Sequence, residues 1–321
     1  MRLRCAGPLD NQRGVALLLT LVVLVLLTAV IVEFDYGAKI NLITAGNFRD
    51  EARATYLAKA GVTAARAVLK EDAKGAQSSK FDALTEFWAR PFPPYPVGEG
   101  FVSVEITDEG GKIDLNRLAE GGAARDDTKT MLRLLFTALE LEPDQIETIV
   151  ESLEDWVDQD DSSGFNGAED SYYLRLNPSY RCKNAPMDTI SELRLVNGVT
   201  PEIYRKIRPY LTTVSIKGPG GVGTINVNTA EPPVLQALDK NINTDTATCI
   251  QNQRPYENWN QFFGCANASS ACQAGSVCKK AVGFASGFFK AKSHGIMHET
   301  EKIVTAVIQK SDLKLISWQI E

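Results

Sequence analysis

VALLLTLVVLVLLTAVIV, residues 15–32, is an uncharged run of eighteen residues that contains no proline. As a helix rising about 1.5 Å per residue, it is about 27 Å long, close to the roughly 30 Å thickness of a bilayer's hydrocarbon core. Arg2, Arg4 and Arg13 precede the run, which predicts a cytoplasmic N-terminus and an extracytoplasmic body after Glu33. The sequence therefore predicts a single membrane-spanning helix near its start.

The boundary before this run distinguishes three kinds of segment. A cleaved secretory signal has an apolar region of about 7 to 15 residues and then a small-residue cleavage site. This run is longer, and Thr28-Ala29-Val30 is a poor site of that kind. A plain uncleaved anchor satisfies the hydropathy equally well. However, Arg13-Gly14 places a small residue after a basic one, immediately before the apolar run, and this favours cleavage on the cytoplasmic side.

This arrangement resembles the leader of type IV pilins and type II secretion pseudopilins. The resemblance implies that a prepilin peptidase cleaves between Gly14 and Val15 and that the new N-terminus is methylated. Most members of that family carry glutamate at the fifth mature position, where this chain has Leu19. Absence of the acid is characteristic of the minor pseudopilin K family of the type II secretion system, which the chain resembles.

The length of the chain allows two domains, and its net charge excludes one class of partner. The chain has 321 residues and a formal net charge of −6. Loss of a leader that holds three arginines and Asp10 brings the charge to −8. A protein that grips nucleic-acid phosphates needs the opposite sign, so we expect no nucleic-acid partner.

Helical patterning continues beyond the membrane run. Leu57, Gly61, Ala64 and Val68, with Tyr56 at the margin, form a stripe that predicts a helix packed on a globular body. A second, short helix is expected at 82–90.

Strand patterning is confined to two regions. Alternation over 102–107 predicts a strand, and the turn residues 108–111 predict a hairpin into 112–115. Residues 303–308 and 314–320 alternate in the same way near the C-terminus. Strands at both ends, with helical patterns between them, predict a small sheet that carries a large helical insertion.

Together with the resemblance, these patterns predict an α+β, pilin-like fold: a long N-terminal helix packed on a small antiparallel sheet, with a large inserted all-α domain. The expected parts are a leader at 1–14, the helix at 15–75, a body made of 76–118 and 281–321, and the insertion at 119–280.

Residues 155–170, DWVDQDDSSGFNGAED, hold six carboxylates within sixteen residues. Counted from Asp158, oxygen-bearing side chains fall at EF-hand positions 1, 3 and 5, and Glu169 falls at position 12. Ser163 stands where the EF-hand glycine belongs, so a calcium loop of different geometry is expected. The alternative is a solvated acidic turn, but carboxylates at a helix C-terminus repel one another without a cation. The candidate calcium ligands are Asp155, Asp158, Asp160, Asp161, Glu169 and Asp170.

The resemblance to the pseudopilin K family extends to this region. It rests on DWVD at 155–158, GAED at 167–170, SELR at 191–194 and INVNT at 225–229. The inserted domain of that family binds calcium, so the resemblance also implies calcium as the cofactor.

Four cysteines, Cys249, Cys265, Cys272 and Cys278, fall within thirty residues of a region expected to be periplasmic, where disulfides persist. One or two bridges are expected, with the pairing left open. Zinc is the rival, but these spacings include no C-x-x-C pair. Cys182 stands apart and is the candidate for the unpaired thiol. The family pattern does not explain the loop from Ala247 to Lys280.

The remaining sequence features do not indicate a catalytic or nucleic-acid-binding site. His294 and His298 are expected to be surface or strand residues, and no nucleophile motif or phosphate-binding loop occurs, so no enzyme is predicted. The turn at Asn197-Gly198-Val199 suggests a DNA-binding helical hairpin, but the acidic body favours protein packing.

The resemblance implies a non-catalytic minor pseudopilin at the tip of the periplasmic pseudopilus, anchored in the inner membrane. Its partners would be minor pseudopilins I and J, the prepilin peptidase and a secreted substrate. The alternative is an uncleaved, membrane-anchored periplasmic module that binds DNA or an exported substrate.

Overall fold

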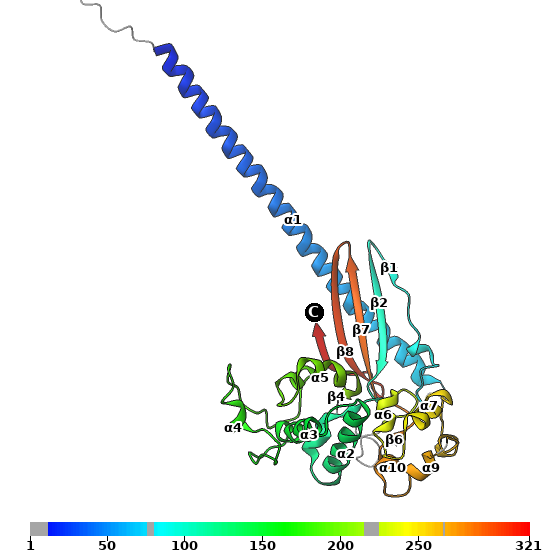
Figure 1. Ribbon diagram of the computed structural model, residues 1–321. Coiled ribbons are helices and arrows are strands. Elements are labelled where there is room, and N and C mark those ends of the chain that lie inside the picture. The colour runs from blue at the N-terminus through cyan, green and yellow to red at the C-terminus, as the bar shows by residue number, and fades with distance from the viewer. Residues whose placement is uncertain (1–11, 76–79, 215–224, 266) are drawn as a thin grey trace, which may run out of the picture.

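One helix dominates the shape of the molecule. The computed structural model describes residues 12–75, 80–214, 225–265 and 267–321. Helix α1 (Gln12–Lys74) has 63 residues, which at 1.5 Å per residue is about 95 Å. Its first half stands clear of the rest of the chain, and its second half lies on a sheet (Figure 1). The predicted long N-terminal helix packed on a body is therefore present.

Small residues let α1 lie close to the sheet. Its buried face consists of Ala54, Leu57, Ala58, Gly61, Val62, Ala65 and Leu69. The predicted stripe was partly wrong, because Ala64 is exposed, Val68 is only half-buried and Tyr56 is 71% exposed. Alanine and glycine at the contact bring the helix axis nearer to the strands than a tyrosine would allow.

The sheet has five antiparallel strands in the order β1-β2-β7-β8-β9. These are β1 (Tyr95–Val97), β2 (Gly100–Asp108), β7 (Phe288–Met297), β8 (Thr300–Gln309) and β9 (Leu315–Ile320). Strands β2, β8 and β9 lie where the sequence predicted strands, although β9 is exposed on both faces apart from Leu315, and β7 was not predicted. The helix expected at 82–90 is only a short 3-10 turn, η1 (Phe87–Ala89).

The predicted hairpin after β2 was wrong. Residues Ile113–Asp114 form β3, which pairs in parallel with β4 (Leu211–Thr212), while β2 pairs with β7. The turn residues form other hydrogen bonds instead. The Gly110 amide donates to the Asp108 carboxylate at 2.7 Å, and the Gly110 carbonyl accepts from the Asn226 amide at 2.8 Å. The chain therefore leaves the sheet at this point and enters the insertion.

The insertion is built from short helices around its own core, which is separate from the smaller apolar clusters between α1 and the sheet. Its longest helices are α2 (Gly122–Ala138) and α3 (Pro143–Val157). The shorter helices are α4 (Asp170–Tyr173), α5 (Pro201–Ile207), α6 (Pro232–Gln236), α7 (Thr244–Asn252), α8 (Trp259–Phe262), α9 (Ala268–Ala271) and α10 (Val277–Ala281). The 3-10 turns are η2 (Leu115–Glu120), η3 (Ile190–Leu195) and η4 (Arg208–Tyr210), and a second parallel pair joins β5 (Ile225–Asn226) to β6 (Val282–Gly283).

A buried polar hub joins the insertion to the sheet. The Asp108 carboxylate, 7% exposed, accepts hydrogen bonds from Thr229 and Ser286 at 2.6 Å each and from Asn226 at 3.1 Å. Burial raises the pKa of Asp108, while these donors oppose the rise. The hub fixes the insertion at the end of the sheet that lies farthest from the free half of α1 (Figure 1).

Candidate functional site

Three of the predicted calcium ligands lie near enough to influence one another's charge, where α3 ends and α4 begins. Asp155 lies on the last turn of α3, Asp158 immediately follows that helix, and Glu169 immediately precedes α4. Their exposed fractions are 3%, 6% and 3%. The loop between the helices folds back because Trp156 of α3 packs edge-on against Tyr173 of α4, with 5.2 Å between ring centroids.

The oxygens of these carboxylates are buried without enough donors. Asp155 Oδ2, Asp158 Oδ1 and both Oε atoms of Glu169 have no hydrogen-bond partner among the described residues. The other Asp155 oxygen accepts a bond from Gly164 N at 3.3 Å. Burying a carboxylate without compensation is costly, so these oxygens fit a set of ligands for a hard divalent cation.

The raised pKa values of the three carboxylates also indicate that their charges are poorly compensated. Burial, followed by the charge of Asp158, raises the pKa of Asp155 to about 6 against hydrogen bonds that lower it. Burial, followed by the charges of Asp155 and Asp158, raises the pKa of Glu169 to about 7. Burial and the charge of Asp160 raise the pKa of Asp158 as well. Each carboxylate thus lacks a positive charge sufficient to offset its burial.

Close packing in the loop requires glycine at position 167. A Cβ on Gly167 would lie 1.9 Å from Asp155 Oδ2, so a side chain there would displace the carboxylate. Asn166 N donates to Glu151 Oε2 at 2.6 Å, and Arg125 approaches Asp158 to 3.6 Å. Glu151 and Arg125 were not predicted to take part, because neither belongs to the acidic run.

The other three predicted ligands have different neighbours. Asp160 accepts from Ser162 N at 2.9 Å, and Asp161 accepts from Asn184 at 2.9 Å, both in exposed positions. Asp170 accepts from Cys182 N at 2.8 Å. Asn184 also has a buried Oδ1 with no partner among the described residues, which makes it an additional neutral oxygen beside the loop. It lies outside the run, so nothing in the spacing indicated it.

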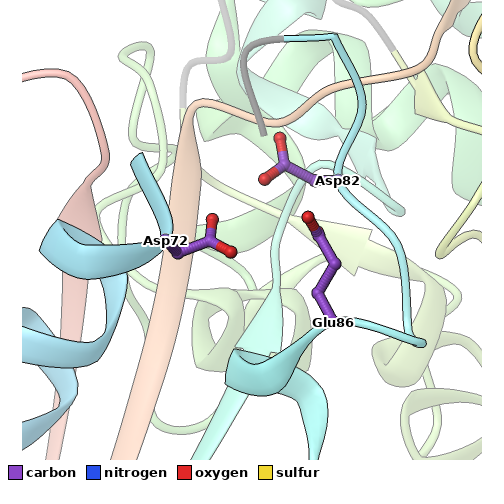
Figure 2. Close-up of side chains that lie close together, drawn as sticks. All are labelled: Asp72, Asp82 and Glu86. Carbon is purple, nitrogen blue, oxygen red and sulfur yellow. The ribbon is translucent and has the colours of Figure 1, made fainter. Parts of the chain in front are cut away.

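A second acidic cluster has a cation of its own. One carboxylate oxygen from each of Asp72, Asp82 and Glu86 lies within 4.8 Å of the other two. Figure 2 shows these three side chains pointing toward one another. Lys310, immediately after β8, forms ion pairs with Asp72, at 2.8 Å, and with Asp82. Glu86 accepts from the Trp88 indole at 2.9 Å. The ammonium group of Lys310 therefore supplies the counter-charge that a metal ion would supply.

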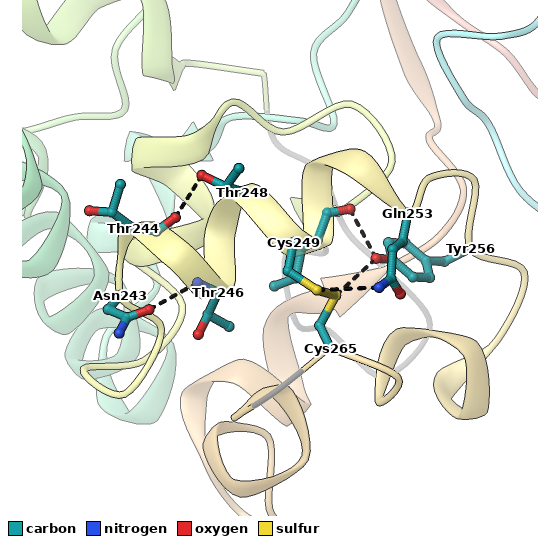
Figure 3. The surroundings of a disulfide bond; sticks show 9 residues. Asn243, Thr244, Thr246, Thr248, Cys249, Gln253, Tyr256 and Cys265 are labelled. Atoms are coloured by element: carbon teal, nitrogen blue, oxygen red, sulfur yellow. Dashed lines mark hydrogen bonds between the residues drawn. A yellow bond between two sulfur atoms is a disulfide. The ribbon is translucent and has the colours of Figure 1, made fainter.

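The clustered cysteines form two bridges, Cys249–Cys265 and Cys272–Cys278, with Cα–Cα distances of 5.9 and 4.8 Å. Figure 3 shows Tyr256 beside the first bridge, where its hydroxyl donates to the Ile250 carbonyl at 2.9 Å. Cys182 is free and buried, as expected for the unpaired thiol. Burial raises the pKa of Cys182 to about 12.

The predicted processing and assembly residues Gly14, Val15 and Leu19 all lie on α1, where they are exposed. Most of the predicted leader, residues 1–11, lies outside the described residues. An eighteen-residue window of α1 with a mean hydropathy of 3.2 is long and apolar enough to cross a membrane.

The remaining candidates serve packing and pairing. His294 contacts Glu301 at 2.6 Å, whereas His298 contacts Asp50 at 3.0 Å, so the two histidines do not share a site. Gly198, with φ +83°, lies against Ile149 of α3.

A half-free apolar helix, an antiparallel sheet on its other half and a helical insertion define a pilin-like assembly subunit whose apolar segment is long enough to cross a membrane. Two family models, each described as type II secretion system (T2SS), protein K, match residues 111–215 and 225–274. The protein K of Pseudomonas aeruginosa is 32% identical over 233 residues, covering 71% of this chain and 68% of that relative. The protein K of Pectobacterium carotovorum is 29% identical over 263 residues, covering 78% and 77%.

The fold is also similar to that of a solved structure. A chain in the crystal structure of the GspK-GspI-GspJ complex from the enterotoxigenic Escherichia coli type 2 secretion system matches with a TM-score of 0.74 at 22% identity. The match covers 87% of this chain and 99% of that chain. This chain belongs to the type II secretion system protein K family and is a minor pseudopilin of that system. The alternative of an unrelated membrane-anchored binding module is not favoured.

Proposed function

We propose that this protein is the non-catalytic tip subunit of a periplasmic pseudopilus. The observation that carries the proposal is the position of the insertion, which lies beyond the end of the sheet far from the apolar half of α1 (Figure 1). In a filament of parallel pilin-like subunits, this bulk obstructs addition of a further subunit on that side. The protein then ends the filament.

Leu19 supports the same position. A glutamate there would offer a carboxylate to the terminal amine of a neighbouring subunit, since an unpaired charge in an apolar filament core is expensive. Leu19 is uncharged and 58% exposed on α1, so it makes no such pair and costs nothing in lipid. A subunit that needs no neighbour on that side fits an end position.

The partners we propose are minor pseudopilins I and J, because the structurally similar E. coli chain is part of a complex with GspI and GspJ. We infer further that a prepilin peptidase removes residues 1–14, that Val15 is methylated, and that the inner membrane holds α1 with the body in the periplasm. A role in presenting secreted substrates belongs to the same proposal.

Two experiments test this assignment. The intact mass of the protein purified from cells with an active prepilin peptidase should correspond to a methylated chain that begins at Val15. Gly14→Val should block cleavage, whereas Leu19→Glu, a change inside the mature helix, should not. Tagged full-length protein extracted in detergent should co-purify with I and J. Retention of residues 1–14, or failure to recover either partner, contradicts the proposal.

We also propose that Asp155, Asp158 and Glu169 hold a calcium ion. The support is their buried oxygens without donors and their raised pKa values. Calcium would supply the positive charge that lets these carboxylates stay ionised while buried, and so would fix α4 against α3. No catalytic step is required of it.

The calcium proposal has its own measurement. Extracellular calcium sites have dissociation constants of about 0.1 to 1 mM, so 10 mM calcium should stabilise the fold by about 1.4 to 2.7 kcal/mol. Thermal unfolding of the full-length protein in detergent is compared in calcium, in magnesium and in chelator. Equal melting temperatures in all three would remove the site.

A further inference from the structure

Strand β2 has an edge that is only half covered. Strand β1 pairs with β2 at Gly100–Val102 alone, whereas β7 pairs with β2 along its whole length. Among the described residues, no strand pairs with 103–108 on the side away from β7. The segment before β1 cannot serve, because Pro91, Pro93 and Pro94 have no amide hydrogen to donate.

The register assigns the backbone groups at this edge. Val97 and Gly100 close a two-residue turn, and Pro96, which cannot donate, is opposite Phe101. Hydrogen-bonded and non-bonded pairs alternate along an antiparallel ladder, so Gly100 and Val102 direct their amides towards β1. By the same alternation, Val104 and Ile106 direct their N–H and C=O groups to the open edge.

A cleft of about 730 Å³ lies along this edge. Trp88 and Phe92 line it on one side, and Tyr210 and Val234 of the insertion line it at one end. In Figure 1 the chain between η1 and β1 runs beside β2 without joining it. The volume falls within the range of about 300 to 1,000 Å³ typical of ligand sites.

The two lysines that line the cleft share a single ion-pair partner. Lys112 and Lys290 line the cleft and share one carboxylate, that of Glu109, with 3.1 Å between Lys290 Nζ and Glu109 Oε1. Side-chain exposure is 17% for Lys112, 34% for Lys290 and 6% for Glu109. Arg90 and Glu105, which carry opposite formal charges, also line the cleft and are exposed.

Two further acids line the cleft, and among the described residues neither forms an ion pair with Lys112 or Lys290. Asp108 is committed to the hub, where it accepts from Thr229 and Ser286. Glu231 lies near Arg254, and its negative charge stabilises the charged form of that guanidinium group. Among the described residues, Glu109 is therefore the one carboxylate within ion-pair distance of these two lysines.

We propose that this cleft binds an extended, acidic peptide segment of a partner protein by strand addition to β2. Main-chain hydrogen bonds to Val104 and Ile106 supply the pairing, as in other sheets that accept an added strand. An acidic side chain of the segment neutralises Lys112 and Lys290. Natural sheets cover or charge their edges, and here the edge faces a cleft, so the occupant is a single strand and not a second sheet. The site does not depend on the calcium loop or on leader cleavage.

The probe is a decapeptide library displayed on phage, selected against full-length protein in detergent. Enriched peptides should carry Asp or Glu next to residues that alternate apolar and polar. A labelled synthetic copy should lose about tenfold in affinity for Lys290→Gln, as loss of one charge-assisted bond predicts. The matched control is Lys292→Gln, an exposed lysine two residues along the same strand that does not line the cleft, and it should bind as before.

Hydrogen exchange provides a readout that is independent of the lysines. Bound peptide should slow exchange of the Val104 and Ile106 amides, and Val104→Pro, which removes one outward amide, should weaken binding. Enrichment of no sequence, equal binding to the two lysine variants, or binding that leaves these amides unprotected would each overturn the proposal.

Discussion

Gly61 of α1 and Ser293 of β7 lie in direct contact: a Cβ added to Gly61 would come within 2.0 Å of the Ser293 hydroxyl oxygen. Two valine methyl groups of β2, from Val102 and Val104, would lie at 2.9 and 2.8 Å from the same atom. On the opposite side of the contact, a Cβ on Gly295 would lie 2.0 Å from the Ala54 carbonyl. The helix and sheet therefore meet at a distance that only glycine allows.

This contact predicts the effect of Gly61→Val. The added side chain must push α1 off β7, and overpacking of this kind costs about 1 to 3 kcal/mol. Chemical denaturation of the full-length protein in detergent measures the loss. Gly46→Ala is the matched control on the same helix, where nothing lies within 4 Å of the added carbon. A Gly61 variant as stable as the control would show that α1 is not held at this distance in solution.

Glu169→Gln should separate the charge of the calcium site from its packing. In chelator, the variant should be at least as stable as the original protein, because it removes a buried charge that has no partner. In calcium, it should lose most of the calcium-dependent rise in melting temperature. Asp161→Asn, on the same loop but exposed, should keep that rise. Equal behaviour of the two variants would argue against Glu169 as a ligand.

The two disulfides should differ in their contribution to stability. Chain entropy predicts about 3 kcal/mol for the 16-residue separation of Cys249–Cys265 and about 2 kcal/mol for the 6-residue separation of Cys272–Cys278. Paired Cys→Ala variants, compared by chemical denaturation, should therefore rank in that order. A larger loss from the shorter loop would mean that local packing, and not loop closure, governs this region.

Glu109 predicts a pH dependence in acid. Burial alone would raise the pKa of Glu109. Lys112, Lys290 and the hydroxyl of Thr212 outweigh that effect and lower the pKa to about 2 from an ordinary value of 4.5. Because the folded-state pKa is the lower one, this stabilisation is complete above pH about 4.5 and is lost as the pH falls towards 2. Its size is about 3 kcal/mol.

Denaturation of Glu109→Gln between pH 5 and 2 tests this dependence. The variant should show a flatter fall in unfolding free energy than the original protein. Glu105→Gln, an exposed acid on the preceding strand, is the control that should follow the original curve. Parallel curves for all three proteins would assign the acid sensitivity to other groups.

The local patterns that the sequence predicted well are those that depend on neighbours in the chain. The apolar run, the strands β8 and β9 and the acidic loop are all visible in short stretches of the sequence. Strand β7 was missed because contact with α1 requires small residues, Ala291, Ser293 and Gly295, at its buried positions. These residues lack the apolar, β-branched character that marks a strand. The tertiary contact thus erased the local signal.

Contacts between residues far apart in the sequence could not be predicted from local patterns either. The turn at 108–111 has the composition of a hairpin, and only the insertion shows why it is not one: Asp108 is held by Thr229 and Ser286. Asn184, which lies outside the acidic run, also contacts the loop only through the tertiary fold, where its side-chain amide donates to Asp161.

The sequence by itself determined the apolar helix, the missing acid at Leu19, the acidic loop and the resemblance that named the family, because each depends on residue type at fixed spacing. Only the tertiary structure decided which three of six carboxylates are buried together, which cysteines pair and which strand edge stays open. Those outcomes depend on burial and on contacts between residues as far apart as Gly61 and Ser293, where the free-energy cost of a buried charge or an extra methyl group is set by neighbours that no local pattern specifies.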